Sequence, residues 1–441
     1  MKNIFVLILL IMGFLIILIS SGCCKKPVGP VTPSGILHSG TITKDETWRE
    51  AGNPHIIEGD LYVWGDSVPT LRIEPGVIVR FKPEGSLEIG RGSLIANGTK
   101  DSSILFTSNN SPAQPGDWKG INFSSSVPNH SILNNCIIEY TGFEGEPSIQ
   151  IGEVHTKSLT ISNSTIRLGK GPGINVGTVD DSLIFMRNVV TQNGGVGINF
   201  GGEANSLTFI ENIISQNGGA GINLDGEFNY LTFAGNIITQ NSSYPIITSS
   251  LENIFSFSKD NNLQGNAIDA INALDAIFIT YSGVLPDLGI PYNMSELYVD
   301  SDSGASLTLE PGCKLKFMPG VGYGNLSVSL LGHGALVANG TIEKPIIFTS
   351  ADSTPEPGDW AGIEFYSSSQ NSTLNNCIIE YGGRSVWWDP IRSNIRINEA
   401  SPTITNNIIR NSRGWGIYIR SGSPIIENNT FSNNALGDIG P

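Results

Sequence analysis

The middle of the chain repeats itself every 24 residues. Leucine returns at one position of each unit and asparagine at another, as Leu159, Leu183, Leu207 and Leu231 and as Asn188, Asn212 and Asn236. Near the C-terminus the period shortens to 22, because the Ser-Pro pair at 401–402 returns at 423–424. A unit this short cannot bury an apolar face alone, so neighbouring units must stack on one another.

Each unit contains short runs that alternate apolar and polar residues, such as Leu207 to Ile210, and Asn or Gly separates the runs. Alternation of this kind is typical of β-strands, and no segment sustains the 3.6-residue period of a helix. The sequence therefore predicts an all-β solenoid of parallel strands. The recurrent asparagines predict inward turns whose side-chain amides hydrogen-bond between neighbouring coils, and the recurrent glycines predict tight corners.

A longer repeat brackets the short one. Four stretches of the first part return in the second, pairing 71–76 with 307–312, 94–99 with 336–341, 115–118 with 357–360, and 134–140 with 375–381. This predicts two duplicated β-helical segments, 36–260 and 291–441, with a connecting segment at 261–290. Within the connection, 267–278 is expected to form one short helix or a loop.

Residues that both copies share are interpreted as structural. Trp118 and Trp360 occupy the same Gly-Asp-Trp context and are predicted to be packing residues. Cys136 and Cys377 lie in matched apolar runs, which predicts buried free thiols.

The C-terminal repeats resemble a known family. The pattern Ser-Pro-x-Ile-x-Asn-Asn-x-Ile from Ser401, followed by Gly-Ile-Tyr-Ile at 416–419, resembles the right-handed parallel β-helix repeats of the pectate-lyase-like superfamily. This resemblance implies a right-handed parallel β-helix in which each repeat is one coil of three short strands. The longer repeat resembles the opening coils of exported β-helix proteins of unassigned activity, so the resemblance concerns fold and not activity.

The N-terminus reads as an export leader, residues 1–23. Lys2 precedes an apolar run from Ile4 to Ile19, and Ser-Ser-Gly then leads to Cys23. Small residues before a cysteine resemble the lipobox of exported lipoproteins, which implies lipidation at Cys23, although Ser20 stands where that motif has a bulky aliphatic residue. An uncleaved membrane anchor and a plain secretory signal are the alternatives. The prediction is an exported protein, anchored in the membrane at the cell surface or in the envelope, with residues 24–35 as a Pro-rich tether.

Composition excludes several classes of function. The chain carries 25 basic and 40 acidic residues, a formal net charge of −15, which argues against a nucleic-acid partner because phosphates require a basic face. Five histidines and five cysteines are scattered without zinc-ligand spacing. No catalytic residues and no cofactor are assigned, with calcium as the one possible ligand.

The calcium hypothesis depends on acidic residues that recur from coil to coil. Glu203 and Glu227 are 24 residues apart and are expected to stack, with Asp180 and Asp181 about one coil before them. Carboxylate oxygens are ligands that Ca²⁺ prefers. The alternative is a solvated acidic edge that discourages unwanted strand association.

One insertion of the second segment differs in sequence from its counterpart in the first, which is Phe-Glu-Gly-Glu at 143–146. It combines arginines and tryptophans, and later coils add more aromatic residues; the candidate glycan-binding residues are Arg384, Trp387, Trp388, Arg392, Trp415 and Tyr418. Aromatic rings stack on sugar faces, and guanidinium groups hold carboxylates or sulfates. The alternative is a loop that packs its tryptophans against the solenoid.

The functional prediction is a surface-anchored structural or binding module, adhesin-like, with polysaccharide as its ligand. The alternative is a polysaccharide lyase or glycoside hydrolase. The Gly-His-Gly at 332–334 resembles a hydrolase motif of this fold, but its companion motifs do not occur, and it aligns with the corner Gly-Arg-Gly at 90–92. Fold alone does not decide between binding and catalysis.

Overall fold

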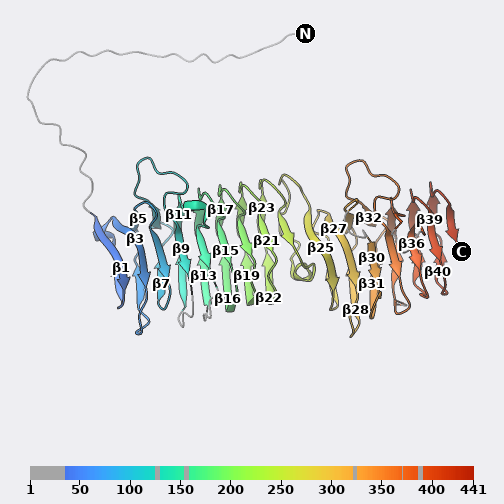
Figure 1. The fold of residues 1–441 in the computed structure, drawn as a ribbon, viewed down its shortest axis with the longest axis horizontal. Helices are drawn as coiled ribbons and strands as arrows, with labels where there is room; N and C mark the ends of the chain where they lie inside the picture. The colour runs from blue at the N-terminus through green and yellow to red at the C-terminus, as the bar shows by residue number, and fades with distance from the viewer. Residues whose placement is uncertain (1–34, 125–129, 153–157, 321–324, 370, 386–390) are drawn as a thin grey trace, which may run out of the picture. The chain divides into compact units, whose positions relative to one another are not determined.

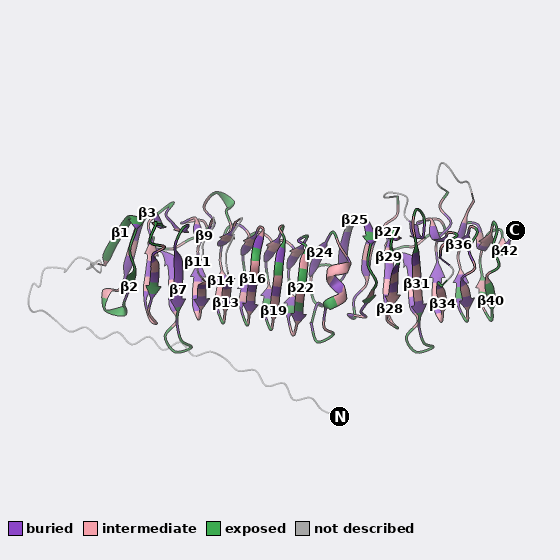
Figure 2. Cartoon of the chain, turned by 90° about the horizontal axis from the view of Figure 1, so that it is seen from below, coloured by how far each residue is buried: buried purple, intermediate pink, exposed green. Residues whose placement is uncertain are grey.

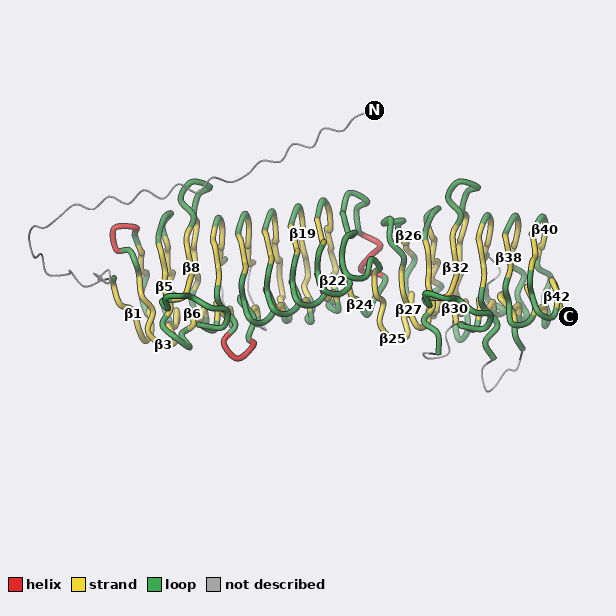
Figure 3. Tube along the Cα trace, turned by 90° about the horizontal axis from the view of Figure 1, so that it is seen from above, coloured by secondary structure: helices red, strands yellow, loops and turns green. Residues whose placement is uncertain are grey.

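The computed structural model describes residues 35–124, 130–152, 158–320, 325–369, 371–385 and 391–441. Gly35–Pro441 forms one compact unit, described here by itself. Its regular elements, within the described residues, are strands together with three short 3₁₀ helices in the connections (Figure 3), namely η1 (Glu50–Gly52), η2 (Phe143–Gly145) and η3 (Glu252–Ser256). The all-β prediction is confirmed.

Each repeat forms one coil, and the coils stack along a common axis (Figure 1). Every strand pairs in parallel with a strand of a neighbouring coil, so the 24-residue period becomes the register of the sheets. Leu159 thus pairs with Leu183, which pairs with Leu207. Stacking gives each short strand the backbone partners that it lacks alone.

One side of the solenoid is built by two separate sheets, one for each segment. The first contains β2 (Glu46–Trp48), β4 (Thr70–Ile73), β7 (Ser93–Asn97), β10 (Ser131–Asn134), β13 (Ser158–Ser162), β16 (Val179–Met186), β19 (Ala204–Ile210) and β22 (Phe228–Ala234). The second contains β26 (Gly283–Leu285), β28 (Ala305–Leu309), β31 (Gly334–Asn339), β34 (Thr373–Asn375), β37 (Thr403–Thr405) and β40 (Ile425–Glu427).

The remaining strands form one continuous sheet with two rows. Row A consists of β5 (Ile78–Phe81), β8 (Ile104–Ser108), β11 (Cys136–Glu139), β14 (Thr165–Arg167), β17 (Val189–Thr191), β20 (Ile213–Ser215) and β23 (Ile237–Thr239), and, in the second segment, β29 (Lys314–Phe317), β32 (Ile346–Ser350), β35 (Cys377–Glu380), β38 (Ile408–Arg410) and β41 (Thr430–Ser432).

Row B follows row A in each coil. In the first segment it consists of β6 (Ser86–Ile89), β9 (Gly120–Phe123), β12 (Ile149–Ile151), β15 (Ile174–Val176), β18 (Ile198–Phe200), β21 (Ile222–Leu224) and β24 (Ile246–Thr248). In the second it consists of β30 (Asn325–Val328), β33 (Gly362–Phe365), β36 (Ser393–Ile397), β39 (Trp415–Ile419) and β42 (Gly437–Gly440). Four strands at the segment starts precede or span the two rows: β1 (Ile36–Ile42), β3 (His55–Val63), β25 (Ile271–Ile279) and β27 (Tyr292–Val299).

The core is a column of apolar side chains inside the coils. Figure 2 colours the buried residues purple along the strands. Phe209, Phe233 and Phe257 stack there, with ring centroids 5.1 and 3.9 Å apart. The predicted packing role of Trp118 and Trp360 is confirmed, because both side chains are fully buried. Cys136 and Cys377 are buried free thiols, as the sequence predicted.

Two ladders of buried asparagines confirm the predicted inward turns. In the first ladder, the side-chain oxygen of Asn212 accepts hydrogen bonds from both the backbone and the side-chain nitrogen of Asn188, each at 3.0 Å. The second ladder repeats this geometry between Asn193 and Asn217. Each amide satisfies backbone groups of the preceding coil and donates to the asparagine of the next coil, so the ladders fix the register along the solenoid.

The connection between the segments is built from strands. The prediction of a short helix or a loop over 267–278 is wrong, because β25 covers Ile271–Ile279 and pairs in parallel with β24 and β27. The sheet changes rows here. The first half of β25 extends row B of the first segment, yet the matching half of β27 pairs with β29 of row A. Row B of the first segment therefore continues as row A of the second.

Candidate functional site

A groove of about 280 Å³ lies on the outer face of row B in the first segment, over β9 and β12. We call it the first-segment groove. Its lining residues are Glu88, Lys119, Gly120, Ile121, Asn122, Phe143, Glu144, Glu146, Pro147 and Gln150. One wall comes from the turn around η2, where the chain leaves the coil at Gly142 with φ of 91°. A side chain at Gly142 would bring its Cβ within 2.7 Å of the Gly171 nitrogen, so the wall requires glycine there.

Lys119 provides a fixed positive charge at the end of this groove. Its Nζ lies 2.9 and 3.1 Å from the two carboxylate oxygens of Asp60, and Ser86 also donates to Asp60 at 2.8 Å. The hydrogen bond with Asp60 raises the pKa of Lys119, outweighing the opposing effect of burial. Lys119 is therefore protonated at neutral pH.

The floor of the groove is the start of a row of amide side chains. Asn122 donates to Glu88 at 2.8 Å, and farther along Asn175 donates to Gln150 at 2.8 Å and Asn199 donates to Asn175 at 2.6 Å. Amides offer both donors and acceptors, and the ring of Phe143 adds an apolar surface beside them. A groove with this lining suits the hydroxyl groups and apolar ring faces of a sugar.

The sequence-based reasoning missed this groove. The signal was present in the Gly-Ile-Asn units at 173–175, 197–199 and 221–223, because a polar residue beside a buried isoleucine must face outward in a strand. The groove itself also needs the turn at 143–146 around η2, which the sequence marks only as the counterpart of the second-segment insertion.

In the second segment, the corresponding outer face of row B holds a buried ion pair. Glu364 on β33 pairs with Arg396 on β36, and both side chains are less than a tenth exposed. Tyr366 donates its hydroxyl to Glu364 at 2.6 Å. Burial lowers the pKa of Arg396 to about 10, and the charge of Arg420 adds to this effect. The two copies thus present unlike chemistry at equivalent places.

The described members of the candidate glycan-binding set lie close to this second face. Trp387 and Trp388 lie outside the described residues. Arg384 is half-buried, and burial lowers its pKa while the charge of Glu296 opposes that shift. Its position beside the row B face is compatible with the predicted role and does not test it.

Three further members of the candidate set lie on or beside two neighbouring strands, β36 and β39. The backbone nitrogen of Trp415 donates to the carbonyl of Arg392 at 2.8 Å. The indole ring of Trp415 lies close to the backbones of Gly437 and Gly440, so one face of the ring packs against the last coil. Tyr418 lies in register beside the arginine of the buried ion pair. Glycan binding by this set stays a prediction.

The acidic residues proposed for calcium come from three successive coils of the first segment. Asp180, Glu203 and Glu227 line one open pocket of about 300 Å³ with Asn205 and Asn229.

Asp181 is not among the lining residues of that pocket. Among the residues that the structure describes, no group of three His, Cys, Asp or Glu side chains is arranged to hold a metal ion. Calcium binding stays a prediction.

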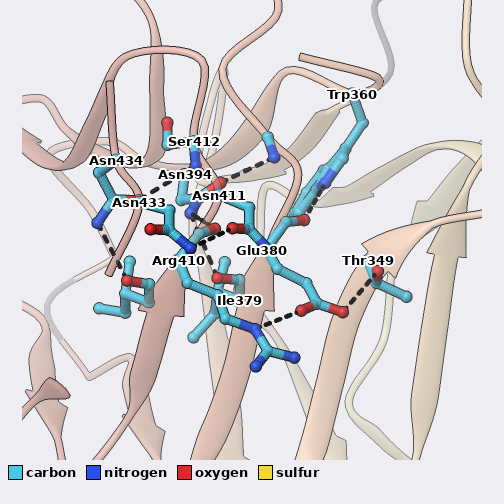
Figure 4. A network of polar contacts seen from close by, with 12 residues as sticks. Thr349, Trp360, Ile379, Glu380, Asn394, Arg410, Asn411, Ser412, Asn433 and Asn434 are labelled. Atoms are coloured by element: carbon cyan, nitrogen blue, oxygen red, sulfur yellow. Dashed lines mark hydrogen bonds and ion pairs between the residues drawn. The ribbon is translucent and has the colours of Figure 1, made fainter. Parts of the chain in front are cut away.

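A buried carboxylate network occurs once in each segment on row A. Glu380 accepts hydrogen bonds from Thr349 at 3.0 Å and from Nε of Arg410 at 2.7 Å, and Trp360 donates to its backbone oxygen at 2.8 Å (Figure 4). Glu139 makes the equivalent contacts in the first segment. The repeated Glu-Tyr pairs in the sequence were the signal for this network, and its buried carboxylate is held by structural partners.

Beside the second network lies a pocket of about 330 Å³, which we call the basic pocket. It is lined by Lys314, Lys316, Ile347, Thr349, Ser350, Asp352, Ser353, Pro355, Ile378, Glu380, Tyr381 and Arg410. Burial lowers the pKa of Lys316, and the like charge of Lys314 lowers it further. No ion pair to either lysine is found within the described ranges.

The leader and its lipidation candidate Cys23 lie outside the described residues. Within the described ranges, no helix has both the length and the apolar character needed to cross a bilayer.

Comparison with known protein families agrees with the coil architecture. The family described as "Right handed beta helix region" matches residues 99–238 and 148–288, and the family described as "Pectate-lyase like beta helix domain" matches residues 285–386. No curated protein gave a match. These matches and the parallel coils identify the folded part of this chain as a right-handed parallel β-helix that includes a pectate-lyase-like domain.

Proposed function

We propose that this chain is an exported β-helix protein, anchored at its N-terminus to the envelope or cell surface, that binds polysaccharide. The observation that carries the binding proposal is the first-segment groove. There Asn122 and Gln150 present amides beside the ring of Phe143, with the charged pair of Lys119 and Asp60 at one end. The export and anchoring part rests on the leader sequence.

The charge state of Lys119 favours binding over elimination at this groove. A lyase requires a basic group that removes a proton beside a carboxylate, so a lysine in that role needs a lowered pKa. The contact with Asp60 raises the pKa of Lys119 instead. A protonated lysine at the end of a groove that Glu88, Glu144 and Glu146 also line is suited to hold a hydroxyl group of a ligand.

The test is a binding screen of the full-length chain, purified in mild detergent, against neutral and uronate-containing polysaccharides. The test variant carries both Asn122→Ala and Gln150→Ala. The expected result is a loss of affinity of about tenfold or more, since two hydrogen-bonding groups are removed. The matched control pairs Asn205→Ala with Asn229→Ala, two amides bonded to each other on a different sheet.

Equal binding by the groove variant and the control variant would contradict the proposal. The same samples are followed for new reducing ends and for the absorbance of new double bonds. Turnover that survives the groove substitutions would place an enzymatic site elsewhere on the molecule, whereas turnover that they abolish would replace binding with catalysis at this groove.

A further inference from the structure

Two exposed loops share a short sequence that the proposed function does not use. Asn-Gly-Thr stands at 97–99, where β7 ends, and again at 339–341, where β31 ends. Residues 99–102 and 341–344 are exposed, and Figure 2 shows both loops in green, projecting from the same edge of the solenoid. We call them the twin loops. The pattern Asn-x-Ser/Thr in a surface loop of an exported chain is the acceptor for an N-linked oligosaccharide.

Packing explains the glycine and the threonine of this shared sequence. A Cβ at Gly98 would lie 2.5 Å from the backbone oxygen of Asn135, so the first loop requires glycine there. The side-chain oxygen of Thr99 accepts a hydrogen bond from the backbone nitrogen of Ser102 at 3.1 Å, which closes the turn. The second loop repeats both features. Neither feature involves the side-chain nitrogen of the asparagine.

The asparagine nitrogens of the twin loops are accessible. The side-chain oxygen of Asn97 accepts a hydrogen bond from Asn134 at 2.8 Å, and that of Asn339 accepts one from Thr373 at 3.3 Å. Both asparagines are exposed, and within the described residues neither side-chain nitrogen donates a hydrogen bond. Each asparagine therefore presents to solvent the atom to which an N-linked glycan is attached.

The structure separates the twin loops from other copies of the acceptor pattern. Asn241 and Asn325 are only 2% and 7% exposed, so the folded protein has no room for a glycan there. Asn163 is exposed, but its side-chain nitrogen donates to Asn134 at 2.9 Å. Among the stretches that align between the two copies, only the twin loops carry the pattern in both. The other asparagines of the pattern are Asn109, Asn122, Asn129, Asn293, Asn371 and Asn428.

The position of the twin loops leaves the first-segment groove open. Asn97 precedes β8 and Asn339 precedes β32, so both stand at the corner where the chain enters row A. The groove lies on row B, one corner farther along the coil. Oligosaccharides at the twin loops would extend from a different edge of the solenoid, so glycan attachment is compatible with ligand binding in the groove.

We propose that Asn97 and Asn339 are glycosylation sites, each carrying one N-linked oligosaccharide. In the transfer, Nδ2 of the asparagine forms a bond to the anomeric carbon of an oligosaccharide that is linked to a lipid phosphate. The bond between that carbon and the phosphate oxygen breaks, the lipid phosphate leaves with the electron pair, and the amide loses a proton. The proposal rests on the export part of the proposed function, because this modification is made on exported chains.

The test uses the full-length chain, purified in mild detergent from the cells that naturally produce it. Mass spectra of the intact protein and of its peptides measure glycan occupancy at each asparagine. Asn97→Gln and Asn339→Gln should each lower the intact mass by one glycan, and the double variant should lower it by two. Asn163→Gln is the matched control, an exposed acceptor pattern whose substitution should leave the glycan mass unchanged.

Substitutions of Thr99 separate glycosylation from other modifications of the asparagine. Thr99→Ser retains the hydroxyl of the acceptor pattern, so the glycan at Asn97 should remain. Thr99→Ala removes the hydroxyl and should abolish the glycan at Asn97, although Asn97 itself is unchanged and Asn339 keeps its own glycan. Circular dichroism verifies that both variants fold. A modification of Asn97 that survives Thr99→Ala would contradict the proposal.

Export is measured separately, by the sensitivity of the chain to protease added to intact cells. If the chain is accessible to protease but the Asn97 and Asn339 peptides have the mass of the bare sequence, the glycosylation proposal is wrong and export stands. If the chain is protected inside the cell and unmodified, both are wrong. Polysaccharide binding is judged independently, by the Asn122 and Gln150 variant.

Discussion

Asn236 accepts two hydrogen bonds from Asn212, one from the backbone nitrogen at 2.9 Å and one from the side-chain nitrogen at 3.1 Å. The same side-chain nitrogen of Asn212 also donates to the backbone oxygen of Phe185 at 3.0 Å. One buried amide thus joins three coils, which accounts for the recurrence of asparagine at this position in three successive units of the central region.

Replacing Asn212 with Ala should destabilise the protein by about 2–4 kcal/mol, because the substitution leaves buried backbone and side-chain groups of Asn188 without an acceptor. Chemical denaturation measures the change. Asn229→Ala is the control, since Asn229 is exposed and bonds to Asn205 on the surface, and its expected effect is below about 0.5 kcal/mol. Equal effects of the two substitutions would argue against the ladder as a stabilising element.

Trp118→Phe should cost about 2–3 kcal/mol of unfolding free energy. The indole nitrogen donates to the backbone oxygen of Glu139 at 2.9 Å, and the ring stacks on Phe81 with centroids 3.7 Å apart. The smaller ring leaves a cavity and a buried carbonyl without its donor. Trp64 is 47% exposed, so Trp64→Phe should change the midpoint of denaturation little.

The buried cysteines should resist alkylation in the folded protein. Burial raises the pKa of Cys136 and of Cys377 to about 12 from an ordinary value of 9. At pH 9 the thiolate is therefore about five hundredfold rarer than in the unfolded chain, and labelling with iodoacetamide should be correspondingly slow until denaturant is added.

The same shift gives stability a pH dependence. Because the folded pKa is raised, the contribution of these thiols is fully present below pH 9 and is lost as the pH rises from 9 toward 12. Unfolding free energies measured across that interval should fall with pH, and Cys136→Ala should reduce the slope. A slope unchanged by Cys136→Ala would contradict the assignment.

The ion pair of Glu364 and Arg396 should respond unequally to single and double substitution. Arg396→Met leaves a buried carboxylate without its partner and should cost about 3–5 kcal/mol. Adding Glu364→Gln removes the uncompensated charge, so the double variant should recover part of that loss. A double variant as unstable as the sum of both single variants would mean that the two charges are not coupled.

The repeat period allowed much of the fold to be predicted, because stacking converts period into register. Leu159, Leu183 and Leu207 aligned in sequence and pair in the sheet. The connection between the segments could not be predicted in this way. Ile271–Ile279 lies where the period weakens, and its partners β24 and β27 belong to different segments. Its strand conformation is set by those neighbours and not by a local pattern.

The candidate sites were harder to predict for a related reason. No pattern in the sequence distinguishes Lys314 and Lys316 from other lysines, and Arg410 follows almost a hundred residues later. Their proximity arises because four successive coils bring β29, β32, β35 and β38 side by side. Likewise, Asp60 and Lys119 are 59 residues apart and meet only when the outer faces of β3 and β9 are placed in one sheet.

The change of strand rows at the joint has a consequence for how such a molecule diversifies. Tandem copying of a segment, joined without rotation, would place each surface beside its own duplicate and would lengthen existing chemistry. If the two copies are joined with a rotation, as at β24, β25, β27 and β29 here, two previously separate surfaces come to lie in line. New combinations of surface groups then arise from the connection alone, before any residue in either copy has been substituted.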